Sequence, residues 1–296
     1  MHTAALRPIV LAAVLALLGG AAAAQDKAAG KRTEPPAKAL FGAKAAPADM
    51  AARAIGFYSR GCLAGAVALP VDGPTWQVMR LSRNRNWGHP ELIRMLERLA
   101  RAAPGLGWPG LLVGDLAQPR GGPMLTGHAS HQVGLDADVW LTPMPDRVLS
   151  RQEREDLAAT NVVAADWNDV DPAVWTPQHL AIIKAAAQQP GVERVLVNAA
   201  IKKALCRDAR GDRSWLAKVR PYYGHHYHMH IRIRCPKDSA DCKGQDPPPE
   251  GDGCGKELDW WFTKQARTPP KKPAKPKPPL TLADLPPACR TVLLAR

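Results

Sequence analysis

The segment from His226 to Cys235 constrains the fold most, because its side chains alternate strictly between two chemical classes. Such alternation is typical of a β-strand, whose successive side chains point to opposite faces. One face is apolar and belongs in a hydrophobic core. The other face carries imidazoles and guanidiniums, from His226, His228, His230, Arg232 and Arg234. A chain that buries this strand needs a sheet with one polar face.

A second segment, Gly127 to Leu141, has a matching composition. Its apolar residues alternate with polar ones, which predicts a strand with Asp136 and Asp138 on one face. His128 and His131 lie in the loop that enters this strand. Five of the nine histidines of the chain fall in these two segments, and a sixth, His225, directly precedes the first. We therefore expect the two segments to fold together.

Together the two segments predict a catalytic zinc site. Zinc binds imidazole and carboxylate groups, and catalytic sites leave one position for water. If the strands are neighbours, His131 and Asp138 converge with His228 and His230, which gives three ligands and one further imidazole. Bound zinc lowers the pKa of water to about 7, and a nearby imidazole can take up and return the proton. Each motif alone is weak evidence, since alternating histidines also occur on strand surfaces.

The N-terminus and the cysteines indicate an exported protein. Residues 1–24 have the pattern of a signal peptide, with an apolar run from Ile9 to Leu18 and three alanines before Gln25. The run is short for a membrane span, so an uncleaved anchor is the weaker alternative. No later stretch predicts a transmembrane segment. All six cysteines follow the signal, and an even number in an exported chain favours three disulfides.

The formal charge of +13 favours a polyanionic environment. Export argues against nucleic acid and fits an anionic cell wall or membrane surface better. The alternative is that the charge serves only solubility.

We expect an α+β fold with a central antiparallel sheet, flanking helices and a zinc cleft on the polar face of the sheet. Residues 25–53 form a flexible leader in this interpretation, 54–266 the folded domain, 267–280 a Pro/Lys-rich linker and 281–296 a tail that Cys289 can tether. Further strands are expected at 110–116 and 192–198. Helices are expected to begin near Pro90, Arg151, Pro177, Ala199 and Glu257.

At its histidine motifs the chain resembles the lysostaphin, D-Ala-D-Ala metallopeptidase and hedgehog clan. Within this clan it is most similar to the penicillin-insensitive murein endopeptidase family. The shared wording is Gly-His-Ala-Ser-His-Gln-x-Gly-Leu-Asp-x-Asp (127 to 138), Val-Asn-x-Ala-Ile-Lys (197 to 202) and His-Met-His-x-Arg-x-Arg-Cys-Pro (228 to 236). The likeness extends from about Cys62 to Phe262, with Cys289 beyond it.

The resemblance implies roles for individual residues. His131, Asp138 and His230 would bind zinc, and His228 would be the general base or stabilise the transition state. His225 also has a family counterpart near the site. In the alternation of the strand, however, it would fall on the face opposite to His228, which predicts a place in the turn before the strand.

Two further features follow from the same resemblance. A second metal position would use His128, Asp166 and Asp169, although Asp169 stands where the family has a histidine. The cysteine pairs would be Cys62–Cys289, Cys206–Cys254 and Cys235–Cys242. Asp136, on the face of Asp138, is a candidate for orienting a ligand.

The function implied by the resemblance is zinc-dependent hydrolysis of D-alanyl–meso-diaminopimelyl cross-links of peptidoglycan in the periplasm. Arg83, Arg85 and Arg232 are candidates for binding substrate carboxylates. One alternative is a D-Ala-D-Ala carboxypeptidase of the same clan. Another is a non-catalytic, zinc-containing module that binds the cell wall. The oligomeric state is open, and a dimer is among the expectations.

Overall fold

The computed structural model describes residues 34–268 and 278–296. The expected signal peptide, the first part of the leader and most of the Pro/Lys linker lie outside the described residues. No helix within the described ranges has the length and apolar character needed to cross a membrane.

A seven-stranded sheet forms the centre of the described chain, with the strand order β10-β9-β11-β8-β7-β5-β4. Its middle is antiparallel, because β11 pairs in that sense with β8 and β9, and β8 with β7. The expected antiparallel centre is thus present, but a parallel pair flanks it on each side, β10 with β9 and β5 with β7. The strands are β4 (Asp72–Gly73), β5 (Trp76–Val78), β7 (Leu111–Val113), β8 (Asp136–Trp140), β9 (Val192–Val197), β10 (Val219–Pro221) and β11 (His228–Ile233).

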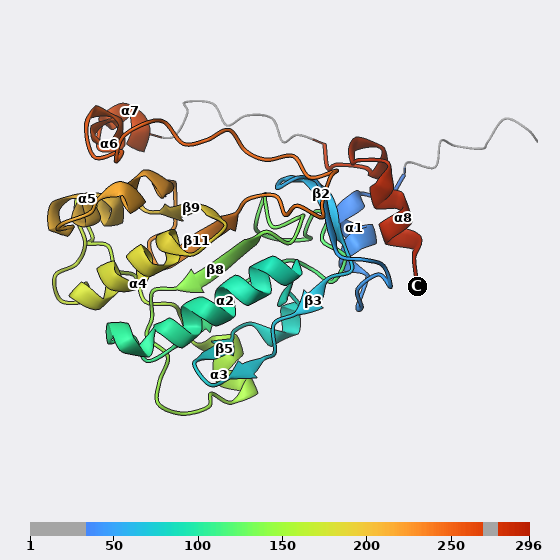
Figure 1. Ribbon diagram of the computed structural model, residues 1–296, viewed down its shortest axis with the longest axis horizontal. Coiled ribbons are helices and arrows are strands. Elements are labelled where there is room, and N and C mark those ends of the chain that lie inside the picture. Colours follow the sequence, from blue (N-terminus) through green and yellow to red (C-terminus); the bar gives the residue numbers. More distant parts are fainter. Residues whose placement is uncertain (1–33, 269–277) are drawn as a thin grey trace, which may run out of the picture. The chain divides into compact units, whose positions relative to one another are not determined.

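Three helices cover the apolar face of this sheet: α2 (Pro90–Ala102), α4 (Pro177–Gln188) and α5 (Ala199–Asp208) (Figure 1). Each begins where the sequence predicts it. His89 caps α2 through its Nδ1, His179 takes part in the capping box of α4, and Asn198 caps α5. Their apolar stripes join the inward residues of β8 and β11 in one hydrophobic core. Three shorter helices are α3 (Arg151–Asp156), α6 (Lys256–Trp260) and α7 (Lys264–Arg267).

The pairing of β8 with β11 positions the polar residues. Asp138 lies opposite His230, and Asp136 lies opposite Arg232. Because side chains alternate along each strand, these four residues share one face. Both strands are buried along their whole length, so other parts of the chain cover most of the polar face.

The leader expectation is wrong for its described part. Residues Ala37–Gly42 form helix α1, and the side chain of Phe41 is fully buried. Phe41 packs with the hairpin of β1 (Arg53–Phe57) and β2 (Arg60–Ala64) and with the C-terminal helix α8 (Ala288–Leu294). The Ala- and Pro-rich composition hid this helix, because its apolar partners are distant in the sequence.

Two short strands, β3 (Val67–Ala68) and β6 (Trp87–Gly88), pair with each other outside the seven-stranded sheet.

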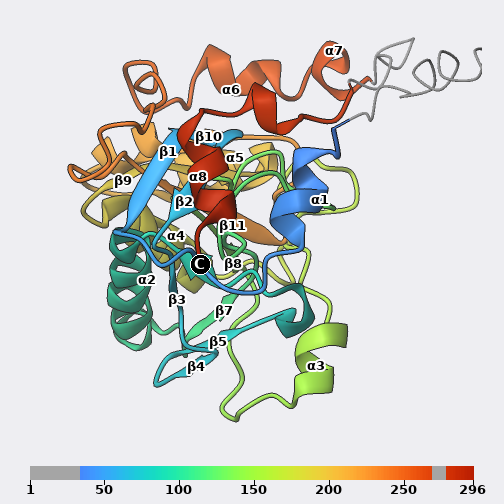
Figure 2. The same cartoon turned by 90° about the vertical axis from the view of Figure 1, so that its right-hand side faces the viewer.

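The C-terminal tail is attached to the body at several points. Figure 2 shows α8 beside β1 and β2, and a disulfide joins Cys62 of β2 to Cys289 of α8. Arg120 adds hydrogen bonds to the carbonyl oxygens of Val292 and Leu293, both at 2.9 Å. The other disulfides are Cys206–Cys254 and Cys235–Cys242, so all three pairs are those that the resemblance implies.

Candidate metal centre

Asp138 is the centre of a cluster of four imidazoles. Its Oδ1 lies 3.1 Å from His230 Nδ1, 3.5 Å from His131 Nε2 and 3.6 Å from His228 Nε2. Its Oδ2 lies 3.4 Å from His128 Nδ1. The two histidine-bearing segments therefore fold together, as the sequence predicts. The positive potential of these rings outweighs burial and holds the pKa of Asp138 well below its usual range.

His131 is the most informative member of the cluster. Its side chain is completely buried, and neither ring nitrogen has a hydrogen-bond partner among the described residues. Burial lowers the pKa of this imidazole, which favours the neutral form that a metal requires. Its backbone is left-handed, with φ at +68°, and the backbone N–H donates to Asp136 Oδ2 at 3.0 Å. Asp136 thus supports an uncommon conformation that turns the ring into the cluster.

His230 lies between two carboxylates. Its Nε2 is 3.0 Å from Asp136 Oδ1, and its Nδ1 is 3.1 Å from Asp138 Oδ1. Burial alone would lower the pKa of His230, but the charge of Asp136 and the hydrogen bonds to both aspartates raise it to about 9. When Asp136 holds Nε2–H, Nδ1 is the ring atom that faces the rest of the cluster. Asp136 therefore contacts two of the predicted ligands, His131 and His230.

His128 lies closer to the predicted catalytic ligands than the sequence indicated. His128, His131 and Asp138 offer ligand atoms that all lie within 4.8 Å of one another, the only such group of three or more within residues 34–268 and 278–296. The Nε2 of His128 faces Asp115 Oδ2 at 3.0 Å. Burial opposes protonation of His128, but Asp115 and Asp138 outweigh it and raise the pKa.

Asp115 is a site residue that the sequence did not single out. It follows the buried strand β7, and its Oδ2 accepts hydrogen bonds from Arg83 at 3.0 Å and Arg85 at 2.8 Å. These arginines were candidates for substrate carboxylates, but Asp115 occupies them. Burial opposes ionisation of Asp115, yet His128 and the arginines lower its pKa to about 2. The only sequence signal was an acidic residue directly after an apolar run.

The guanidinium of Arg232 is likewise engaged by other side chains of the protein. Its Nε donates to Asp136 Oδ1 at 2.7 Å, and its Nη1 donates to Gln245 Oε1 at 2.7 Å. The guanidinium also lies 3.9 Å from the ring centre of Tyr58. Arg232 therefore orients Asp136 from the neighbouring strand, and the expectation that it is free for a substrate is not met.

His228, the fourth imidazole of the cluster, has a further imidazole beside it, that of His225. His228 is buried, its Nδ1 has no hydrogen-bond partner among the described residues, and burial lowers its pKa to about 4. His225 lies in the turn before β11 with φ at +50°, in agreement with its predicted place. Its Nδ1–H donates to the Tyr223 carbonyl oxygen at 2.8 Å, which leaves Nε2 as an acceptor. The rings of His225 and His228 are 4.7 Å apart.

The structure does not group Asp166 and Asp169 with His128. Asp169 pairs with Arg207 at 2.7 Å and with Lys203 at 3.6 Å. Asp166 accepts two hydrogen bonds from Asn168. Both carboxylates are therefore engaged within their own loop and with neighbouring cations.

The donor set fits zinc. A buried imidazole with two unpartnered nitrogens beside an ionised carboxylate is costly unless a ligand satisfies it, and imidazole with carboxylate is a common zinc environment. Two pockets open beside the cluster, of about 280 Å³ next to His228 and about 470 Å³ next to His225 and His230. His128 lines both pockets, so the candidate metal centre lies between them.

Comparison with known proteins agrees with this geometry. Residues 54–294 match the family described as penicillin-insensitive murein endopeptidase. A protein of that name from Yersinia enterocolitica is 47% identical over 241 residues, which is 81% of this chain and 85% of the relative. Relatives of the same name from Klebsiella pneumoniae and Haemophilus influenzae are 44% and 46% identical, over 83% of this chain and 88% and 84% of the relatives. The chain belongs to the penicillin-insensitive murein endopeptidase family.

Proposed function

We propose that this protein is a zinc-dependent endopeptidase that cleaves peptide cross-links of peptidoglycan in the periplasm. The observation that carries the proposal is the buried, unpartnered imidazole of His131 beside the ionised Asp138. Family membership supports the substrate class, because the relatives are named murein endopeptidases. The signal peptide pattern at residues 1–24 supports export.

We assign the metal to His131, Asp138 and His230, with His128 next to them. When bound, zinc would polarise the scissile carbonyl and lower the pKa of a water molecule. Asp136 holds Nε2 of His230 and the backbone of His131, so it would fix the orientation of both rings. Asp115 would do the same for His128.

His228 is the proposed general base, and His225 is proposed to assist it. Burial lowers the pKa of His228 to about 4, which keeps the ring neutral at neutral pH, the form that a general base has before it takes up a proton. Burial also lowers the pKa of His225, whose hydrogen bond to Tyr223 leaves Nε2 free to accept a proton. The proposed bond is the D-alanyl–meso-diaminopimelyl amide, which hydrolysis splits without a protein nucleophile.

Digestion of purified cross-linked muropeptides tests the reaction. The proposal predicts conversion of dimers into monomers without release of free D-alanine. Release of D-alanine from pentapeptides with intact cross-links would instead identify a carboxypeptidase. Binding to peptidoglycan without any cleavage would leave only a wall-binding module.

A further inference from the structure

Two arginines extend the polar face of the sheet beyond the metal centre. Arg194 of β9 lies opposite Arg232 of β11, and Arg220 of β10 lies opposite Leu196, which lies opposite His230. The paired positions place both arginines on the face that carries Asp138 and His230. The metal ligands thus continue sideways into a cationic surface.

Arg194 has less charge compensation than Arg220 and Arg232 on this face. Its Nε is buried without a hydrogen-bond partner among the described residues. Its Nη2 donates only to the backbone carbonyl of Asp246. No carboxylate within residues 34–268 and 278–296 lies at ion-pair distance from it, whereas Arg232 is paired with Asp136. A half-buried guanidinium with unused donors is suited to binding an anion.

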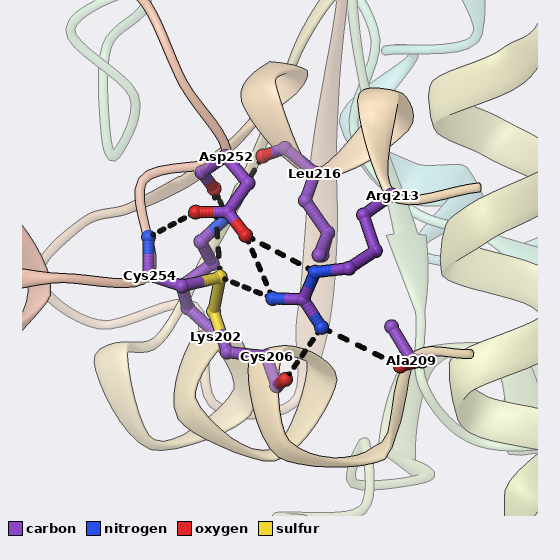
Figure 3. The surroundings of a disulfide bond; sticks show 7 residues. All are labelled: Lys202, Cys206, Ala209, Arg213, Leu216, Asp252 and Cys254. Atoms are coloured by element: carbon purple, nitrogen blue, oxygen red, sulfur yellow. Dashed lines mark hydrogen bonds and ion pairs between the residues drawn. A yellow bond between two sulfur atoms is a disulfide. The ribbon is translucent and has the colours of Figure 1, made fainter. Parts of the chain in front are cut away.

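Arg220 is held rigidly beside it. Glu257 of α6 pairs with its guanidinium. Its Nη1 has no hydrogen-bond partner among the described residues and lies against Gly253, where a Cβ added to the glycine would come within 2.7 Å of this nitrogen. Gly253 lies between Asp252 and Cys254, whose surroundings at the Cys206–Cys254 disulfide are shown in Figure 3. Arg213 donates to Asp252 Oδ2 at 2.7 Å, and Lys202 donates to the Asp252 carbonyl oxygen at 2.6 Å.

Both arginines line the pocket of about 470 Å³ that His225 and His230 also line. Residues placed diagonally on neighbouring strands, as His230 and Arg194 are, have Cβ atoms about 7–8 Å apart. An arginine side chain spans most of this distance. A substrate held at His230 therefore has a guanidinium within reach of the atoms next to its scissile bond.

We propose that Arg194, with Arg220 behind it, binds the carboxylate on the carbon that carries the scissile nitrogen. The inference rests on the proposed function and names a subsite within it. In a D-alanyl–meso-diaminopimelyl cross-link this carbon bears a free carboxylate, two bonds from the nitrogen that leaves. A guanidinium can bind a carboxylate through two parallel hydrogen bonds and so orient the amide over the metal centre. Amidation of that carboxylate removes its charge.

Two cross-linked muropeptides test the subsite: one with the free carboxylate and one with the same group as a carboxamide. The wild-type full-length protein is expected to cleave the free acid with a kcat/KM at least about tenfold higher, the range of a charge-assisted hydrogen bond. The Arg194→Gln variant keeps a hydrogen-bonding side chain without the charge. It should lose most of this preference through a higher KM for the acid, while its rate on the amide stays within about twofold of wild type.

Arg234→Gln is the matched control, because Arg234 is an exposed arginine directly after β11 and does not line this pocket. It should retain the preference, and so should Arg194→Lys. Equal cleavage of both substrates by the wild type would overturn the subsite and leave the proposed function intact. An equal loss on both substrates in Arg194→Gln would also overturn it. Cleavage of neither by the wild type would remove the proposed function and this inference with it.

Discussion

Two polar clusters in this protein differ in how well their hydrogen-bonding atoms are satisfied. Around the Cys206–Cys254 disulfide, Arg213 uses all three of its nitrogens in hydrogen bonds, and Lys202 donates to the carbonyl oxygens of Leu216 and Asp252 at 2.7 and 2.6 Å (Figure 3). Around Asp138, the imidazole of His131 and one nitrogen of His228 have no such partner among the described residues.

This difference indicates which cluster stabilises the fold and which cluster binds a ligand. A satisfied polar network orders the chain, whereas unsatisfied buried donors and acceptors cost free energy that a ligand can recover. The first cluster should therefore affect stability and leave chemistry alone. The second should affect metal binding and turnover, at a smaller cost to folding.

The largest effect is expected from His131→Ala. Removing this ligand should abolish both metal binding and muropeptide cleavage, because three protein ligands are needed to hold the ion. Metal analysis and digestion of dimeric muropeptides measure the two losses. His226→Ala is the control, since His226 lies in the other histidine-bearing segment and packs against Trp167 instead of joining the cluster. A His131→Ala protein that retains one metal ion and full turnover would contradict the assignment of metal binding to this cluster.

His228→Ala should lower kcat by about 10²–10⁴-fold, the usual contribution of a positioned acid or base. Metal content should stay at the wild-type value, because His131, Asp138 and His230 remain. Steady-state kinetics and metal analysis on one preparation separate these outcomes. Unchanged kcat would exclude His228 from the proposed role.

Removing the Cys206–Cys254 disulfide with Cys206→Ala and Cys254→Ala should act on stability. The bond closes a loop with a sequence separation of 48, for which chain entropy gives about 4 kcal/mol. Chemical denaturation measures this loss, and metal content per folded molecule should not change. Loss of the metal in the folded variant would show that the two clusters are coupled.

The smallest effect concerns Lys202, which is fully buried. Burial, with a smaller contribution from Arg220, lowers its pKa from 10.5 to about 7. Because the unfolded chain binds this proton more tightly than the folded one, the lysine makes stability rise with pH between these values. The gain from pH 7 to pH 9.5 should be on the order of 3 kcal/mol.

Lys202→Met should remove this part of the pH dependence, which denaturation curves at both pH values would measure. If the free energy of unfolding changes by the same amount between the two pH values in the variant and in the wild type, Lys202 remains charged in the folded protein over this range. Its two hydrogen bonds to carbonyl oxygens permit this.

The sequence predicted the parts of the site that depend on short-range pattern. Alternation along 226–235 and 135–141 predicted that His230 and Asp138 lie on the polar faces of their strands, because strand periodicity determines the face of each side chain. The pairing of β8 with β11 then places the two residues opposite each other. Helix starts such as Pro90 and Pro177 were predicted because capping is local.

Long-range partners could not be predicted in this way. Asp115 interacts with His128 through a pairing of β7 with β8 that no local pattern indicates. Phe41 is buried only because α8 and the β1–β2 hairpin meet it. Arg232 looked free on its strand, yet it pairs with Asp136 from the neighbouring strand. No sequence pattern indicates Arg194, and only the pairing of β9 with β11 places it beside this site.

Removal and return of the metal test the central claim most directly. The protein would be treated with a chelator, dialysed and assayed on dimeric muropeptides before and after the addition of one equivalent of zinc. The account predicts complete loss of cleavage and its recovery with zinc, with His131→Ala not recovering. Full cleavage by the metal-free protein would contradict it.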